Sequence, residues 1–454
     1  MGAFHAYDIR GIYGVDFDRE TAYKVGYFVP GLLGAKEVVV GRDCRVSSLE
    51  IHEALVEGIT DAGADAIDLG LSSTPMVYFA TAAYGYKASI QITASHNPAN
   101  YNGMKVSREN ALPVGLDTGL GEIRRMIDEG RPTPKAAQRG KRVERNIMED
   151  YLAFMRRFKG DYSSLKIAFD LSNGMSTLFA REVFGDAPSY IFDDMDGRFP
   201  NHEPNPLIPA NVEPLKELVR RNGADVGVIY DGDADRVMFV DERARFVAPD
   251  LVVALMARYF IDMKGASRPV VLQEIRSSKA VPEILSKKGC DVHTWRVGRA
   301  YAAPKLREID GLWGGELAGH YYFKDFFYSD SGLLSSLIVL NIVASLKAEG
   351  RTLGEEMDRL TLYRNSGEIN FRVEDKQGAM EAVKDYFSAG KAPQKMMDFD
   401  GYRLEFEDWW FNIRPSNTEP YLRFICEAGD EALLERRIQE TEKIICKKFG
   451  GERV

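Results

Sequence analysis

The chain has 454 residues, too many for a small binding module and enough for about three or four domains. Hydrophobic residues make up 45% and charged residues 28% of it, which is typical of folded globular proteins rather than disordered or fibrous ones. The 59 basic and 68 acidic side chains give a net charge of −9, the wrong sign for general attraction to nucleic acid or an anionic membrane. We therefore expect no nucleic-acid or membrane partner, and an anionic ligand must be attracted locally.

The cysteines and the N-terminal residues indicate a cytoplasmic protein. The four cysteines are far apart and form no CxxC pair, which argues against a zinc ribbon, a redox motif or a disulfide framework. Charged residues interrupt the first twenty positions, so we expect no secretion signal there. The longest uncharged stretch, 332–346, is shorter than the roughly twenty apolar residues of a membrane span. We expect it to form a buried helix.

Short apolar runs alternate with helical patterns through the first three quarters of the chain, as in βαβ units that form mostly parallel sheets. In chain order, the patterns predict strand 37–40, helix 48–62 and strands 64–69 and 88–92; then strands 165–169 and 189–192, helix 213–222 and strand 225–230; then strand 269–272, helix 279–288 and strand 291–295. A polar, functional-looking loop follows each of these three blocks. The blocks therefore predict three similar α/β domains.

The last part of the chain has a different pattern. It predicts strands near 368–373, 402–406, 409–413 and 421–427 and helices at 378–387 and 432–447. This order is typical of an α+β domain. The Pro-, Gly- and Lys/Arg-rich segment 129–145 is predicted to cross between the first two domains. We expect units at 1–145, 146–246, 247–362 and 363–454: three similar βαβ-type mixed-sheet domains, then a smaller α+β domain.

The acidic segment between the predicted strands 225–230 and 237–240 is the most informative one. Asp231, Asp233 and Asp235 alternate with small residues, and oxygen ligands at this spacing can converge on one hard divalent cation such as Mg²⁺. A solvated acidic turn is the alternative. An EF-hand is excluded, because Arg236 replaces the required glycine and a strand replaces the exiting helix.

A small hydroxyl, Ser95, follows the predicted strand 88–92. With an Asn-Pro turn after it and Lys105 close behind, it suits a nucleophile or a phosphate carrier. A plain Asn-Pro turn explains these residues equally well. A hydrolase dyad of Ser95 and His96 is a third possibility, but adjacent side chains seldom point at each other and no G-x-S-x-G elbow surrounds the serine.

Two later loops carry polar groups suited to a sugar phosphate. In the glycine-rich loop 314–320, Glu316 can accept hydrogen bonds from sugar hydroxyls, and His320 can donate to an anion or transfer a proton. A lone histidine in such a loop is more often structural. The segment 414–420, with Arg423, offers a guanidinium fork, hydroxyls and an amide that match a phosphate. A polar turn is the alternative there.

Together and in this order, the four segments resemble the signature loops of the α-D-phosphohexomutase superfamily, over the whole chain. Further segments support the resemblance: YDIRG at 7–11, GRD at 41–43, and FPNH at 199–202 with Pro204. The sequences YNG at 101–103 and RPSN at 414–417 look most like the bacterial phosphomannomutase/phosphoglucomutase branch. The resemblance implies domains arranged around a central cleft.

The resemblance also implies roles for single residues. Ser95 would hold the transferable phosphoryl group, with Mg²⁺ bridging it to Asp231, Asp233 and Asp235. The cations and the acid/base around that group would be Arg10, Lys105, Arg236 and His320. The substrate residues would be Glu316 and Ala318 at the sugar and Arg414, Ser416, Asn417, Thr418 and Arg423 at the phosphate that is not reacting. The implied reaction moves phosphate between C1 and C6 of a hexose phosphate through a phosphoserine and a hexose 1,6-bisphosphate, which also primes the enzyme.

Two residues depart from the family pattern. Ala318 stands where most relatives have serine, which affects the sugar preference, and Arg299 stands where the branch often has a histidine. Arg299 cannot act as an acid or base, because its pKa stays above about 12, and it can instead bind phosphate. Acid/base duty would then fall to Lys105 or His320.

Three alternative functions stay open: a phosphoglucosamine mutase, a non-catalytic sugar-phosphate sensor and a serine-phosphoenzyme phosphatase. The expected partners are small hexose phosphates, and the expected state is a monomer or weak homodimer.

Overall fold

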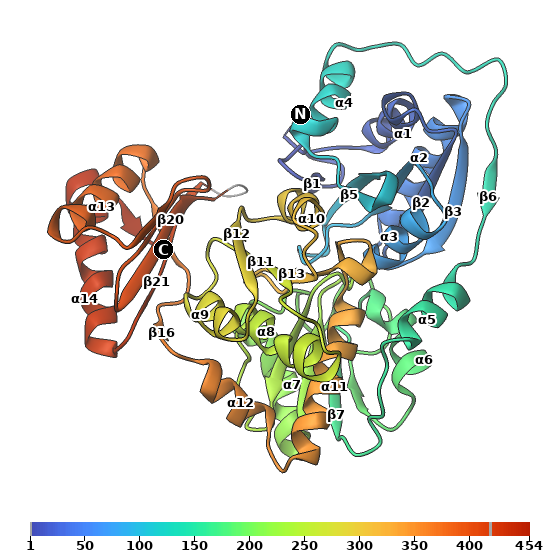
Figure 1. The fold of residues 1–454 in the computed structure, drawn as a ribbon. Helices are drawn as coiled ribbons and strands as arrows, with labels where there is room; N and C mark the ends of the chain where they lie inside the picture. Colours follow the sequence, from blue (N-terminus) through green and yellow to red (C-terminus); the bar gives the residue numbers. More distant parts are fainter. Residues whose placement is uncertain (1, 417–419) are drawn as a thin grey trace.

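The structure, a computed structural model, describes residues 2–416 and 420–454 and divides them among four sheets (Figure 1). The first sheet has the order β1-β5-β4-β2-β3-β6. Its strands are β1 (Ile9–Ile12), β2 (Glu37–Arg42), β3 (Asp65–Leu71), β4 (Ala88–Ile92), β5 (Tyr101–Arg108) and β6 (Arg142–Glu144). Helices α1 (Arg19–Leu33), α2 (Ser48–Asp61), α3 (Thr74–Ala83) and α4 (Leu120–Asp128) accompany it.

This first sheet is mixed, as expected for a βαβ-type domain with one reversed strand. β2 pairs in parallel with β3 and β4, whereas β5 runs antiparallel to both β1 and β4. The predicted strands and the helix over 48–62 are confirmed, but β5 and helices α1 and α3 were not predicted. The segment 129–145 is more than a linker, because β6 within it pairs in parallel with β3.

The second and third sheets have the orders β10-β9-β7-β8 and β12-β11-β13-β14-β15. The second contains β7 (Ile167–Asp170), β8 (Ser189–Ile191), β9 (Val226–Tyr230) and β10 (Val237–Asp241), with α5 (Met148–Arg156), α6 (Ala180–Phe184) and α7 (Pro209–Asn222). The third contains β11 (Val270–Glu274), β12 (Asp291–Trp295), β13 (Trp313–Gly315), β14 (Tyr321–Phe323) and β15 (Ser329–Asp330), with α8 (Pro249–Leu255), α9 (Ala280–Lys287), α10 (Arg299–Glu308), α11 (Gly332–Ala348) and α12 (Leu353–Leu360).

Helix α11 is the buried helix predicted over 332–346, and it joins the second and third domains. Tyr230 at the end of β9 donates a hydrogen bond of 2.7 Å to Ser336 of α11. One continuous hydrophobic core includes Tyr78, Phe169 and Leu337 from the first three units, so these units pack as one body. Among the described helices none alone is long and apolar enough to cross a membrane; α11 and α12 reach that test only as a pair bent by 104°.

The fourth sheet is antiparallel, with the order β18-β19-β20-β21-β17-β22 and β16 paired to β21. Its strands are β16 (Arg364–Asn365), β17 (Ile369–Arg372), β18 (Lys395–Met397), β19 (Tyr402–Glu405), β20 (Trp409–Pro415), β21 (Tyr421–Ala428) and β22 (Glu452–Arg453), covered by α13 (Lys376–Gly390) and α14 (Glu431–Glu442). This unit has a hydrophobic core of its own and stands to one side of the others, in orange and red (Figure 1). Three α/β units and one α+β unit confirm the predicted fold class, and we retain 1–145, 146–246, 247–362 and 363–454 as their proposed limits.

The third and fourth units meet through buried polar groups. Ser278 donates a hydrogen bond of 2.6 Å to the Glu427 carboxylate, and Arg403 donates to two carbonyl oxygens of the third unit. Asp250, which is 2% exposed, accepts a hydrogen bond from the backbone N–H of Ser278. Burial, reinforced by the nearby Glu427 carboxylate, raises the pKa of Asp250 to about 7.

This raised pKa predicts a pH dependence of stability. A carboxyl group that titrates near pH 7 when folded, and near its ordinary value when unfolded, contributes stability at low pH that is lost as the pH rises toward 7, by about 1.4 kcal/mol per pH unit. We expect Asp250→Asn to flatten this part of the stability curve between pH 5 and pH 7, measured by urea unfolding. The control is Asp161→Asn, at an exposed position. Backbone and side-chain hydrogen bonds from Ser163 lower the pKa of Asp161, so this carboxyl stays ionised between pH 5 and pH 7. Equal slopes in Asp250→Asn and the wild type would contradict the assignment.

Candidate active site

Ser95 lies in the loop that connects β4 to β5, at the carboxyl end of a central strand. Its side chain is fully buried, and its backbone adopts φ = 50°, in the left-handed region that non-glycine residues seldom adopt. Ser95 Oγ donates a hydrogen bond of 2.7 Å to Asp231 Oδ2 from the second unit. The serine loop and the acidic loop, 136 positions apart, therefore meet at one hydrogen bond.

His96 bears on the hydrolase alternative. Contrary to the expectation for adjacent residues, His96 Nδ1 approaches Ser95 Oγ to 3.4 Å. That distance is longer than the roughly 2.6–3.2 Å of an engaged nucleophile and base. Burial, reinforced by Arg236 and Arg10, lowers the pKa of His96 well below its usual range, so its ring is neutral. Ser95 has a much shorter bond to Asp231 than to His96.

The acidic loop connects β9 to β10 and brings three buried carboxylates together. Asp231, Asp233 and Asp235 each offer an oxygen atom within 4.8 Å of the others, so the group can hold a metal ion. Burial and the repulsion of Asp233 and Asp235 raise the pKa of Asp231 well above its ordinary value. A turn exposed to water, the alternative from the sequence, does not match this burial.

Lys105, on β5, neutralises part of this negative charge. Its Nζ donates to Asp233 at 2.7 Å and to Asp235 at 2.5 Å. Although burial opposes the charged form, these two carboxylates raise the pKa of Lys105, so the ammonium stays charged. The second oxygens of Asp233 and Asp235, their Oδ1 atoms, are buried and have no hydrogen-bond partner among the described residues. Unpartnered carboxylate oxygens of this kind fit a divalent cation.

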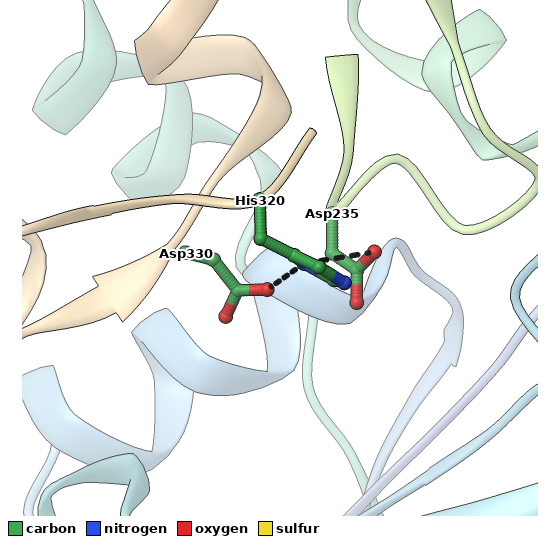
Figure 2. A group of neighbouring side chains, drawn as sticks. All are labelled: Asp235, His320 and Asp330. Atoms are coloured by element: carbon green, nitrogen blue, oxygen red, sulfur yellow. Dashed lines mark hydrogen bonds and ion pairs between the residues drawn. The ribbon is translucent and has the colours of Figure 1, made fainter. Parts of the chain in front are cut away.

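Arg236 and His320 join the acidic loop to the third unit. Arg236 Nε donates to His320 Nε2 at 2.9 Å, and His320 Nδ1 lies 2.7 Å from Asp330 Oδ2. A guanidinium can only donate, so His320 Nε2 accepts from Arg236 and the ring proton lies on Nδ1. Nδ1 donates a hydrogen bond to Asp330. Figure 2 shows the imidazole between the carboxylates of Asp330 and Asp235, the latter 3.8 Å from Nδ1.

Arg299 begins helix α10 and contacts the first and third units. Its Nε donates to Asp330 at 2.9 Å, its Nη2 donates to the carbonyl of Ala111 at 2.7 Å, and its guanidinium carbon lies 3.7 Å from the centre of the Tyr78 ring. The buried Asp330 therefore accepts from both Arg299 and His320. Although burial opposes it, these partners lower the pKa of Asp330 to about 2.

Arg10 and the sugar loop border the same region. Arg10, on β1, donates to Asn97 at 2.8 Å in the serine loop and to Asp8 at 2.5 Å. Glu316, directly after β13, accepts a hydrogen bond of 2.6 Å from Tyr322, and burial raises its pKa. Ala318 is half-buried in the same turn.

The expected phosphate residues lie on the fourth sheet. Arg414, on β20, is 2% exposed; its Nε donates to Asp400 at 2.9 Å, and its Nη2 has no partner among the described residues. Ser416 comes directly after the last residue of β20, and its backbone N–H donates to the carbonyl of Tyr421. Arg423, on β21, lies 3.3 Å from Glu368. Asn417 and Thr418 lie outside the described residues.

Three neighbours of these groups were not identified from the sequence. Thr74 donates its hydroxyl to Asp233, Asp330 holds His320, and Asp400 bridges the backbone N–H of Val297 and the side chain of Arg414. Thr74 lies 159 positions from Asp233, Asp400 lies 103 positions from Val297, and no local pattern marks Asp330 as the partner of His320. Only the fold brings them together.

Four family models match the chain in order. They describe phosphoglucomutase/phosphomannomutase alpha/beta/alpha domain I over residues 1–133, domain II over 149–244, domain III over 248–363 and the C-terminal domain over 368–444.

The similarity to individual proteins also extends over the whole chain. A phosphomannomutase of Salmonella montevideo is 34% identical over 98% of this chain and 99% of its own length. The crystal structure of a phosphoglucomutase/phosphomannomutase family protein from Burkholderia thailandensis is 25% identical, with a TM-score of 0.84, and covers 98% of this chain and 97% of its own. An N-acetylphosphoglucosamine mutase of Aspergillus fumigatus, in complex with GlcNAc-6P and magnesium, has a TM-score of 0.59 at 13% identity, covers 98% of this chain and 96% of its own, and so shares the fold.

The acidic loop leads to a test with magnesium. Two groups of possible metal ligands share Asp235: Asp231 and Asp233 complete one, and His320 and Asp330 complete the other. A cation at about 100 times its dissociation constant stabilises a folded protein by about 2.7 kcal/mol. We expect Mg²⁺ to raise the melting temperature of the wild type, Asp231→Asn to abolish most of that rise, and Asp330→Asn to keep it. The reverse pattern would place the cation at the His320 group instead.

Proposed function

The chain belongs to the phosphoglucomutase/phosphomannomutase family, and on that basis we propose that Ser95 carries the phosphoryl group which the enzyme moves between C1 and C6 of a hexose phosphate. The enzyme is a phosphohexomutase, an isomerase of hexose phosphates. The observation that carries the proposal is the buried hydrogen bond of 2.7 Å between Ser95 Oγ and Asp231 Oδ2, beside Lys105 of the first unit and Arg236 of the second.

The reaction has two halves that share one site. In the first, the C6 hydroxyl of a hexose 1-phosphate attacks the phosphorus of phospho-Ser95, the bond from phosphorus to Ser95 Oγ breaks, and a hexose 1,6-bisphosphate forms. The bisphosphate then turns round, and Ser95 Oγ attacks the C1 phosphate, which restores the phosphoserine and releases the 6-phosphate. An enzyme isolated without phosphoserine therefore needs a hexose 1,6-bisphosphate as primer.

The cations stabilise the transferring group. Phosphoryl transfer passes through a loose transition state with negative charge on its equatorial oxygens. Lys105, Arg236 and Arg10 supply fixed positive charge there. A divalent cation held by the acidic loop supplies further charge at these oxygens when it is bound. Lys105 binds the Oδ2 atoms of Asp233 and Asp235, which leaves their Oδ1 atoms as ligands that would hold a divalent cation.

His320 is the better supported of the two acid/base candidates. Although burial opposes the charged form, Asp233 and Asp235 raise the pKa of Lys105 and keep it protonated. A protonated amine has no lone pair with which to accept a proton. His320 Nε2 has a lone pair, which is exposed to the substrate when Arg236 turns toward the phosphoryl oxygens. It then accepts the proton of the attacking sugar hydroxyl and returns it to the C1 oxygen that leaves in the second half, while Nδ1 keeps its own proton in the hydrogen bond to Asp330, whose carboxylate stabilises the imidazolium.

The fourth unit binds the phosphate that is not reacting. Asp400 holds Arg414 by Nε, which leaves Nη2 as a donor for a phosphate oxygen. Ser416, Asn417, Thr418 and Arg423 complete this site in the proposal, and Glu316 accepts hydrogen bonds from the sugar hydroxyls. Since either phosphate of the bisphosphate fits this site, the sugar can bind in both orientations.

Ser95→Ala should leave the fold intact and abolish turnover, because the phosphoryl group has no acceptor; we expect a fall of at least about 10⁴-fold. The matched control is Ser89→Ala, since Ser89 is a buried serine of β4 whose hydroxyl has no partner among the described residues. Mass spectrometry after incubation with glucose 1,6-bisphosphate should find one added phosphoryl group in the wild type and Ser89→Ala, and none in Ser95→Ala. Full activity of Ser95→Ala would remove Ser95 from this role.

The sugar preference is tested by phosphorus NMR with Mg²⁺ and catalytic glucose 1,6-bisphosphate. We expect mannose 1-phosphate and glucose 1-phosphate to become 6-phosphates, and glucosamine 1-phosphate to react more slowly. Ala318→Ser should change the ratio of these rates, because it adds a hydroxyl to the turn that carries Glu316. Fastest conversion of glucosamine 1-phosphate would identify a phosphoglucosamine mutase, binding without conversion a sensor, and release of inorganic phosphate a phosphatase.

A further inference from the structure

Arg45 lies beneath the serine loop, and its side chain is completely buried. It follows the motif GRD at 41–43, whose role the mechanism above leaves unexplained. An arginine has five N–H donors in its guanidinium, and a buried one is costly unless its donors are paired. In Arg45 all five have partners, and four of these partners are backbone carbonyls of one loop.

The two terminal nitrogens of the guanidinium donate hydrogen bonds to these four carbonyls. Nη1 donates to the carbonyls of Pro98 and Tyr101 at 2.6 and 3.0 Å. Nη2 donates to those of Ser95 and Asn97 at 2.9 and 2.7 Å. The four hydrogen bonds therefore tie the backbone of segment 95–101 to one guanidinium.

The fifth donor fixes Arg45 itself. Its Nε donates to Asp43 at 3.1 Å, and Asp43 also accepts from the backbone N–H of Arg45 and the hydroxyl of Ser48. Ser48 begins helix α2, so the fork is anchored to regular structure. Because Arg45 is itself anchored, it can set the geometry of the loop carbonyls that it binds.

The second unit closes over the same arginine. The ring of Phe199, in the FPNH segment, lies 4.9 Å from the guanidinium carbon of Arg45. Gly197 approaches so closely that an added Cβ would lie 2.5 Å from Arg45 Cα, and one at Gly232 would lie 2.5 Å from the Ser95 carbonyl oxygen. The carbonyl that Arg45 binds is therefore also the surface against which the acidic loop packs.

We propose that Arg45 is the positioning residue of the serine loop, and that its hydrogen bonds to the loop carbonyls hold Ser95 in the conformation that aims Oγ at Asp231. The proposal rests on the phosphocarrier role proposed for Ser95. It explains how a serine is kept at φ = 50°, a left-handed conformation that is strained for a residue other than glycine. It also explains why two motifs with no reacting group, GRD and FPNH, converge on this loop.

The test replaces Arg45 by lysine, which keeps the charge but offers three donors on one atom in place of the planar fork. We expect the single-turnover transfer from phospho-Ser95 to saturating hexose 1-phosphate to fall about 100-fold, as for a misplacement of about 1 Å. The substrate concentration at half saturation should stay within about threefold of the wild type, because Arg45 contacts neither Glu316 nor Arg414. The phosphoserine signal in phosphorus NMR should shift.

Arg403→Lys is the matched control. Arg403 is equally buried, donates to two carbonyls and stacks on Trp410, but it lies between the third and fourth units. It should lower the melting temperature without shifting the phosphoserine signal. Asp43→Asn serves if Arg45→Lys fails to fold, and it should give a smaller loss in the same direction because it releases only Nε.

The outcomes separate the two proposals. A wild type that turns over without any phosphoserine overturns the proposed role of Ser95. A phosphorylated wild type beside an Arg45→Lys or Asp43→Asn variant with unchanged transfer rate and signal overturns the role of Arg45 alone. Equal changes in Arg45→Lys and Arg403→Lys reduce Arg45 to a general packing residue and also overturn it.

Discussion

The burial of three carboxylates in one short turn is the constraint on which the rest of the site depends. Asp231, Asp233 and Asp235 repel one another in a medium of low dielectric, so each needs a compensating charge or proton. The acidic loop itself supplies only Arg236. Lys105 reaches it from the first unit and pairs with Asp233 and Asp235, and the His320 ring of the third unit lies 3.8 Å from Asp235, so the surroundings of this one loop depend on the packing of three units.

The same burial leaves carboxylate oxygens available at the acidic loop. Lys105 binds the Oδ2 atoms of Asp233 and Asp235, and their Oδ1 atoms have no hydrogen-bond partner among the described residues. Arg236 is shared between the acidic loop and His320. Asp330 is held by the anchored Arg299, which fixes the orientation of the imidazole.

The fourth unit is connected to this centre by a chain of polar contacts rather than by a shared hydrophobic core. The backbone N–H of Leu317, in the sugar loop, donates to Glu274, which pairs with Arg276 at 2.9 Å. Arg276 pairs in turn with Glu368 at 3.1 Å, and Glu368 pairs with Arg423. Polar contacts between units are more easily rearranged than packed apolar ones, so packing fixes the position of the fourth unit less firmly than that of the other three.

The sequence by itself determined many of the strands and helices and indicated candidate groups for the site. Apolar runs and helical periodicity located β2, β4, β9 and α11, because these patterns are local. The spacing of the three aspartates indicated a cation site, whereas the role expected of Ser95 came from the resemblance, since an Asn-Pro turn explained its loop equally well. Helix α3, β5 and the contacts of Thr74, Arg45, Asp330 and Asp400 were decided only by the tertiary structure. A buried arginine that binds loop carbonyls, or a carboxylate that orients a histidine, is defined by its partner across the fold. The guanidinium of Arg299 shows the difference best. From its charge, the sequence predicted that it binds phosphate. Its place between Asp330, Ala111 and Tyr78 follows from the packing of two units, which no local pattern encodes.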